Sequence, residues 1–94
     1  MAVVMRMEWR GVSAEQYDEL REIVNWENDP ATGGIFHVAF MDEGGFKVVD
    51  VWESAEHFQT FVDERLMPGV AQVGVQGEPK VTITPAHAVW NSKG

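Results

Sequence analysis

The sequence predicts an α+β domain in which two helices cover one face of a four-stranded antiparallel sheet. Four apolar segments have the length and the valine-rich composition of strands. Two other segments follow a serine and carry apolar residues at helical spacing. In chain order these segments give β-α-β-β-α-β, which the ferredoxin-like arrangement accommodates. The first and third strands are then central, and the second and fourth strands form the edges.

The N-terminal third is expected to form a strand and a helix. Residues 2–9, AVVMRMEW, have the composition of a strand. Ser13 precedes Gln16 by three residues, which is the spacing of a helix capping box. The helix, within residues 11–28, then has a face at helical spacing made of Tyr17, Leu20, Ile23, Val24 and Glu27. Asp-Pro and Gly-Gly in residues 28–34 end it.

Two strands and a turn are expected next. Residues 35–42, IFHVAFMD, and residues 46–53, FKVVDVWE, flank the turn sequence DEGG and predict a hairpin. The turn is expected to hold two residues or four. Both lengths give the same facing pairs, namely Met41 with Phe46, Ala39 with Val48, His37 with Asp50, and Ile35 with Trp52. A turn of three residues would instead place His37 opposite Val51.

The C-terminal part is expected to hold a second helix and the last strand. Ser54 caps a helix over residues 55–67, whose apolar stripe consists of Phe58, Phe61, Val62 and Leu66. Pro68 and Gly69 are expected to interrupt it before a further helical turn. Residues 81–90 predict the last strand, and Pro85 within it indicates an edge position or a bulge.

The composition limits the class of protein. A chain of 94 residues, 45% of them apolar, is expected to form a single domain over residues 1–94. The net charge of −8 argues against nucleic acids and anionic membranes as partners, because such binding depends on clustered cations. The chain has no cysteine, and no segment has the pattern of a signal peptide or a membrane span. These features favour a cytoplasmic location.

The predicted hairpin places an ionisable pair among apolar residues. His37 and Asp50 face one another across the strands, with their Cβ atoms about 5 Å apart. An aspartate that accepts a proton from one ring nitrogen fixes the tautomer and leaves the other nitrogen free to act as a base. A satisfied structural pair at a dimer interface is an equally weighted alternative.

The opposite face of the hairpin is also apolar in its middle, with Phe36, Val38, Phe40, Val49 and Val51. Two helices cover only one face of a four-stranded sheet. A second copy of the chain is therefore expected to cover the other face.

The segment GIFHVAFMDEGGFKVVDVWESAEHFQTFVDERLMPGV resembles the dimeric α/β-barrel superfamily, in particular small proteins similar to antibiotic biosynthesis monooxygenases. The most specific part runs from Gly45 to Gly69, where a strand ends in VWES and a helix follows. The resemblance implies a homodimer whose two sheets form a barrel, with a pocket between sheet and helices in each subunit. Members include cofactor-free oxygenases, cyclases, isomerases and haem-degrading enzymes. Haem-degrading relatives carry an Asn on the first strand and a late His, which are absent here.

The remaining candidate residues are apolar or aromatic. The expected substrate-binding residues are Trp52, Tyr17, Trp26, Phe61 and Met41, with Tyr17 and Trp26 on the first helix. The three histidines have no zinc-site spacing, so neither a metal nor a cofactor is expected.

We therefore expect an enzyme that acts on a hydrophobic, aromatic or polyketide-like molecule. His37 would be the general base and Asp50 its orienting partner, and the product of proton removal would be oxygenated, cyclised or isomerised. The alternative is a non-catalytic dimeric module that binds a small molecule or is structural.

Overall fold

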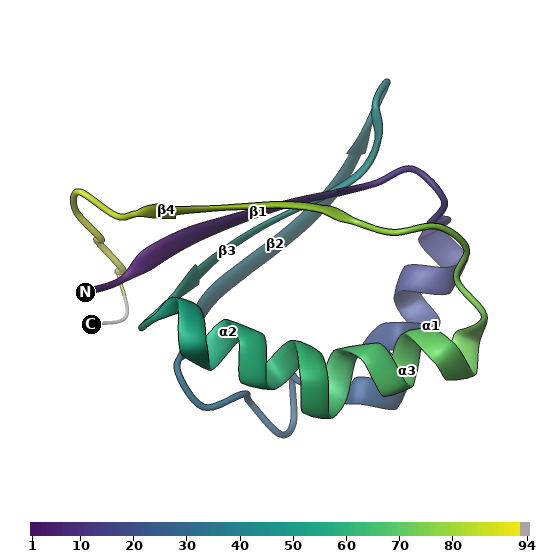
Figure 1. Ribbon diagram of the computed structural model, residues 1–94, viewed down its shortest axis with the longest axis horizontal. Helices are drawn as coiled ribbons and strands as arrows, with labels where there is room; N and C mark the ends of the chain where they lie inside the picture. Colours follow the sequence, from purple (N-terminus) through teal and green to yellow (C-terminus); the bar gives the residue numbers. More distant parts are fainter. Residues whose placement is uncertain (93–94) are drawn as a thin grey trace.

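Figure 1 shows the computed structural model of the chain, in which residues 1–92 are described. The elements are β1 (Val3–Trp9), α1 (Ala14–Val24), β2 (Gly34–Asp42), β3 (Gly45–Trp52), α2 (Ala55–Phe61), η1 (Val62–Leu66), α3 (Met67–Val73) and β4 (Lys80–Pro85). The predicted order of strands and helices is confirmed. None of the helices in residues 1–92 combines the length and the hydropathy that traversing a bilayer requires.

The four strands form one antiparallel sheet in the order β2-β3-β1-β4. The first and third strands are central, as predicted. The sheet is curved, and the helices lie together on its concave side (Figure 1). The ferredoxin-like fold class is therefore confirmed, and one sheet face is left without helices.

The hairpin has the predicted register over most of its length. Asp42 pairs with Gly45, so the turn is the two-residue alternative, and Gly45 adopts a φ of 109° that favours glycine. His37 pairs with Asp50 as expected. The expected pairing of Ile35 with Trp52 is wrong, because a bulge at Ile35 lets Gly34 pair with Trp52 instead.

Helix α1 begins with the predicted capping box. The Ser13 hydroxyl accepts from the Gln16 backbone N–H at 3.1 Å, and the Gln16 side chain accepts from the Ser13 N–H. The helix ends at Val24 because Asn25 adopts the left-handed conformation, with φ of 61°. Trp26 therefore lies in the following loop, and its expected place on the helix is wrong.

The second helical region is continuous, so the expected interruption at Pro68 and Gly69 is wrong. Segment η1 is a π-helix that joins α2 to α3, and the Met67 N–H bonds to the Val62 carbonyl five residues back. Pro68 falls in the first turn of α3, directly after this π-helical segment, and its missing backbone N–H does not end the helical region. The predicted Ser54 cap is present, since its hydroxyl accepts from the His57 N–H at 3.1 Å.

Strand β4 is shorter than expected. It ends at Pro85, since proline cannot donate to a strand ladder, and the Ala86 N–H bonds to the Ala2 carbonyl instead. Residues 86–90 therefore do not continue the strand, and its expected end at Trp90 is wrong. The Trp90 side chain lies beyond the sheet and is 84% exposed.

The core lies between the concave sheet face and the helices. Alternate residues of β3 are buried, so Phe46, Val48, Asp50 and Trp52 face the helices. On β1 the buried residues are Met5, Met7 and Trp9, and the helices contribute Leu20, Val24, Phe58 and Val70. The opposite sheet face leaves Phe36, Val38 and Phe40 exposed.

The contact between α1 and α3 depends on Gly69. A Cβ atom at this position would lie 2.7 Å from Val24 Cγ2 and 3.4 Å from Leu20 Cδ2. We expect Gly69→Ala to lower the free energy of unfolding by about 1–3 kcal/mol, because overpacking separates the two helices. Urea denaturation measures this. Gln72→Ala, on the exposed side of α3, is the control and should change stability by less than about 0.5 kcal/mol. Equal stabilities of the two variants would contradict the close helix contact.

Candidate active site

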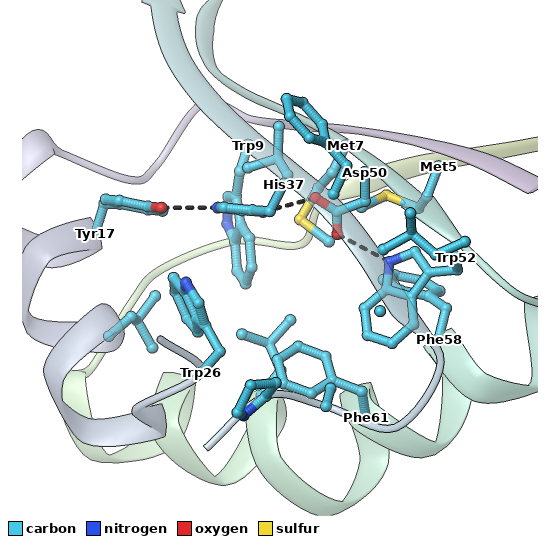
Figure 2. A pocket seen from close by; sticks show the side chains of 18 of the residues that line it. Met5, Met7, Trp9, Tyr17, Trp26, His37, Asp50, Trp52, Phe58 and Phe61 are labelled. Carbon is cyan, nitrogen blue, oxygen red and sulfur yellow. Dashed lines mark hydrogen bonds and ion pairs between the residues drawn. The ribbon is translucent and has the colours of Figure 1, made fainter. Parts of the chain in front are cut away.

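A cavity of about 230 Å³ lies between the sheet and the helices (Figure 2). Its walls come from β1, α1, the loop after α1, β2, β3, α2 and η1. Most of the lining side chains are aromatic, aliphatic or methionine, and only Tyr17, His37 and Asp50 are ionisable. An apolar cavity with one group of polar side chains is the usual form of a small-molecule site.

Asp50 holds the centre of the polar group. It is 6% exposed, and a buried carboxylate requires hydrogen-bond donors. Its Oδ1 lies 2.6 Å from His37 Nδ1, and its Oδ2 accepts from the Trp52 indole N–H at 3.0 Å. The facing pair predicted from the sequence, His37 and Asp50, is thus in direct contact. Trp52 joins the pair through its hydrogen bond to Asp50.

The second ring nitrogen of His37 is also engaged. Its Nε2 lies 2.7 Å from the Tyr17 hydroxyl. With the Asp50 carboxylate accepting from Nδ1–H, Nε2 is the acceptor and the Tyr17 O–H donates. The nitrogen that was expected to be free therefore accepts from Tyr17, and the four side chains form one chain from Tyr17 through His37 and Asp50 to Trp52 (Figure 2).

Aromatic rings surround this chain of hydrogen bonds. The centroid of the His37 ring is 5.4 Å from the Trp26 ring, and the Tyr17 ring is 4.9 Å from Phe46. At the other end, Trp52 packs against Phe58 and Phe61, at centroid distances of 5.6 and 5.4 Å. These contacts restrict the orientation of each polar ring and exclude water from part of its surface.

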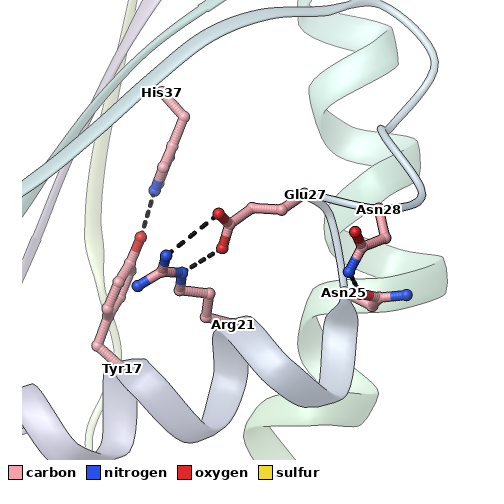
Figure 3. A network of polar contacts seen from close by, with 6 residues as sticks. All are labelled: Tyr17, Arg21, Asn25, Glu27, Asn28 and His37. Carbon is pink, nitrogen blue, oxygen red and sulfur yellow. Dashed lines mark hydrogen bonds and ion pairs between the residues drawn. The ribbon is translucent and has the colours of Figure 1, made fainter.

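Burial raises the pKa of the Tyr17 hydroxyl. The Arg21 guanidinium acts in the opposite direction, but Arg21 is paired with Glu27, which raises the Tyr17 pKa (Figure 3). In that pair, Arg21 Nη2 donates to Glu27 Oε2 at 3.1 Å, and the pairing lowers the pKa of Glu27. Tyr17 is therefore protonated at neutral pH and can donate to His37.

Arg65 fixes the loop that carries Trp26. Its Nη2 donates to the Val24 carbonyl at 2.9 Å and to the Asp29 carbonyl at 2.7 Å, and its guanidinium lies 5.5 Å from the Phe61 ring centroid. Arg65 thus holds the end of α1 and the loop against η1. Pro30 and Ala31 of the same loop line the cavity.

The structure brings together most of the predicted site residues. His37, Asp50, Trp52, Tyr17, Trp26 and Phe61 all line the cavity. Met41 is not among its lining residues and is 54% exposed, so the expectation that it lines the pocket is wrong. Met41 lies on the edge strand β2, whereas its pairing partner Phe46, on the central strand β3, is buried and lines the cavity.

Other lining residues were not predicted. Met5, Met7 and Trp9 form a wall on β1, and Phe46 contributes from β3. In the sequence, Arg6 and Glu8 alternate with the three apolar residues of β1, and this pattern indicates that one face of the strand is buried. Within residues 1–92, no three His, Asp or Glu side chains come together as metal ligands.

No protein-family model matches the sequence, and no curated protein matches it. Solved structures do match. An antibiotic biosynthesis monooxygenase is 16% identical, with 94% of this chain and 100% of that chain covered and a TM-score of 0.61. SnoaB, a cofactor-independent oxygenase from Streptomyces nogalater, is 11% identical over 94% and 93% of the two chains, with a TM-score of 0.62.

A third match is a dimeric ferredoxin-like protein of unknown function from Thermobifida fusca. It is 12% identical over 92% of each chain, with a TM-score of 0.65. The chain shares the fold of these proteins. The resemblance to antibiotic biosynthesis monooxygenase-like proteins is therefore confirmed for the fold, and identities this low carry no activity or substrate across.

Tyr17 is the only tyrosine in the sequence, so its ionisation can be read directly. Because burial raises its pKa above about 10, the unfolded chain loses this proton first as the pH rises. The associated stability is complete below about pH 10 and is lost as the pH rises through the folded pKa. We expect tyrosinate absorbance to develop at higher pH in the native protein than in the same protein in urea. A native curve at or below the urea curve would contradict the burial of Tyr17.

Proposed function

We propose that the protein is an enzyme that removes a proton from a hydrophobic aromatic or polyketide-like substrate, with the His37–Asp50 pair as the final proton acceptor. The observation that carries this proposal is the 2.6 Å contact between His37 and a buried Asp50 at the wall of an apolar cavity. A carboxylate on one ring nitrogen stabilises the imidazolium that forms when the other nitrogen takes up a proton.

The cavity supports this substrate class. Aromatic side chains line it on several sides, and a planar ring system gains from burial against such faces. The polar group is confined to one part of the wall, which suits a substrate with a single acidic O–H or C–H. Proton removal gives a phenolate or carbanion, and such an anion can react with oxygen, cyclise or isomerise without a metal or flavin. SnoaB, which shares the fold, is described as a cofactor-independent oxygenase.

A non-catalytic binding or structural module is the second candidate. The observation that favours it is that the buried polar atoms of the site already have hydrogen-bond partners within the protein. Within residues 1–92, every buried side-chain nitrogen or oxygen atom has a hydrogen-bond partner. A network kept for stability has the same property.

We further propose that a second copy of the chain covers the open sheet face. Phe36, Val38 and Phe40 are 56%, 41% and 44% exposed there, and they come from one edge strand. Such a contiguous apolar surface indicates an interface. The Thermobifida fusca protein with this fold is described as dimeric. The partner would complete a barrel of two sheets with the helices outside.

Washout of tritium from 10-tritiated anthrone, measured under argon, tests the proposed chemistry. Anthrone is a flat tricyclic ketone with an acidic central C–H, and washout reports proton removal whatever the later reaction. We expect the parent protein to accelerate washout and His37→Gln to lose about 10²-fold or more of that rate, because the proton acceptor is gone.

His87→Gln is the matched control, since the same substitution falls on an exposed residue beyond β4. It should retain the parental rate. If the parent is no faster than His37→Gln while both bind anthrone, the binding module replaces the enzyme. Quenching of tryptophan fluorescence measures that binding, because Trp26 and Trp52 line the cavity.

Sedimentation at micromolar concentration tests the dimer. We expect the parent to sediment as a dimer and Val38→Glu to weaken association by about a hundredfold or more, because the new carboxylate would be buried without a partner. Gln72→Glu adds the same charge on the exposed side of α3 and should leave the dimer intact. A monomeric parent would show that no second copy covers the open face.

A further inference from the structure

The hydroxyl of Tyr17 occupies the ring nitrogen of His37 that the proposed reaction needs. His37 Nδ1 is held by Asp50 at 2.6 Å and Nε2 by Tyr17 at 2.7 Å, so both ring nitrogens already have partners. The His37 ring also lies near the Trp26 ring, at a centroid distance of 5.4 Å. A substrate in the cavity therefore finds no ring nitrogen of His37 available for direct contact.

The hydroxyl oxygen of Tyr17, by contrast, can still accept a hydrogen bond from a substrate. Its ring lines the cavity, and within residues 1–92 the hydroxyl has His37 as its one hydrogen-bond partner. A phenol oxygen that donates one hydrogen bond can still accept another. The side chain packs against the rings of Phe46 and Trp26, at centroid distances of 4.9 and 5.8 Å, on a helix whose first turn is capped. Its hydroxyl is thus held at a fixed place.

We propose that Tyr17 is a catalytic residue that relays the substrate proton to His37. The Tyr17 oxygen takes the proton from the substrate C–H or O–H while the Tyr17 O–H proton moves to His37 Nε2. The products of this step are a substrate anion, a neutral Tyr17 and an imidazolium, and Asp50 balances the imidazolium charge. No electrons are exchanged, and no co-reactant is consumed.

The surroundings favour a coupled transfer over a free phenolate. Burial raises the pKa of Tyr17, so its separate ionisation is unfavourable in this site. Passing one proton on while receiving another avoids that ionised state. The Trp52 N–H on Asp50 Oδ2 keeps the carboxylate in place at the far end. This relay rests on the proposed function, because it adds a step to the same proton removal.

Tyr17→Phe tests the relay, since it keeps the ring and removes only the hydroxyl. With 10-tritiated anthrone as the probe, we expect the variant to bind anthrone as the parent does but to lose about 10²-fold or more of the washout rate, as His37→Gln does. We also expect a slower parental rate in D₂O than in H₂O. The exchangeable Tyr17 proton moves in the relay, whereas direct removal of the triton by His37 moves only the substrate hydrogen.

The outcomes separate the two proposals. If the parent exceeds His37→Gln but Tyr17→Phe is as fast as the parent, Tyr17 only covers His37, and the relay is overturned while the proposed function stands. A parental rate that is equal in H₂O and D₂O overturns the relay in the same way, and this measurement does not require the variant to fold. A parent no faster than His37→Gln overturns the proposed function and the relay together.

Discussion

The arrangement of the site depends on one constraint, which is that the carboxylate of Asp50 is buried and must be given donors. A carboxylate in an apolar interior is costly unless it is hydrogen-bonded. Asp50 obtains one donor across the hairpin, from His37, and one along its own strand, from Trp52. The first requires the register of the β2–β3 hairpin, because a shift by one residue would turn His37 to the opposite face. The polar group of the site therefore depends on the register of the hairpin.

The same hydrogen-bonded group explains how a mostly apolar cavity can contain ionisable side chains. Asp50 uses both carboxylate oxygens inside the protein, and His37 then presents its remaining nitrogen to Tyr17 on the helix above. The polar groups satisfy one another in a line along one wall, which leaves the rest of the surface to aromatic and aliphatic side chains. Under the proposed function, such a site offers a substrate one proton acceptor, with few other polar groups to compete for it.

The two faces of the sheet have different surroundings. Its concave face, with Met5, Met7 and Trp52, forms the core and the cavity, whereas Val38 and Phe40 on the other face are exposed. Because side chains on a strand alternate, the β2–β3 hairpin supplies both surfaces at once. This explains how a chain of 94 residues can form a cavity on one face of its sheet and still expose an apolar surface on the other.

The sequence alone determined the order of elements, the caps at Ser13 and Ser54, and the facing of His37 and Asp50. These features depend on local patterns: strand alternation, capping geometry and a glycine-rich turn. Only the tertiary structure decided that the helices cover the His37 face and that Tyr17 meets Nε2. It also decided the bulge at Ile35 and the π-helical segment η1 that precedes Pro68. Those features depend on how the helices pack against the sheet. Such packing joins residues that are distant in the sequence, so no local sequence pattern predicts it.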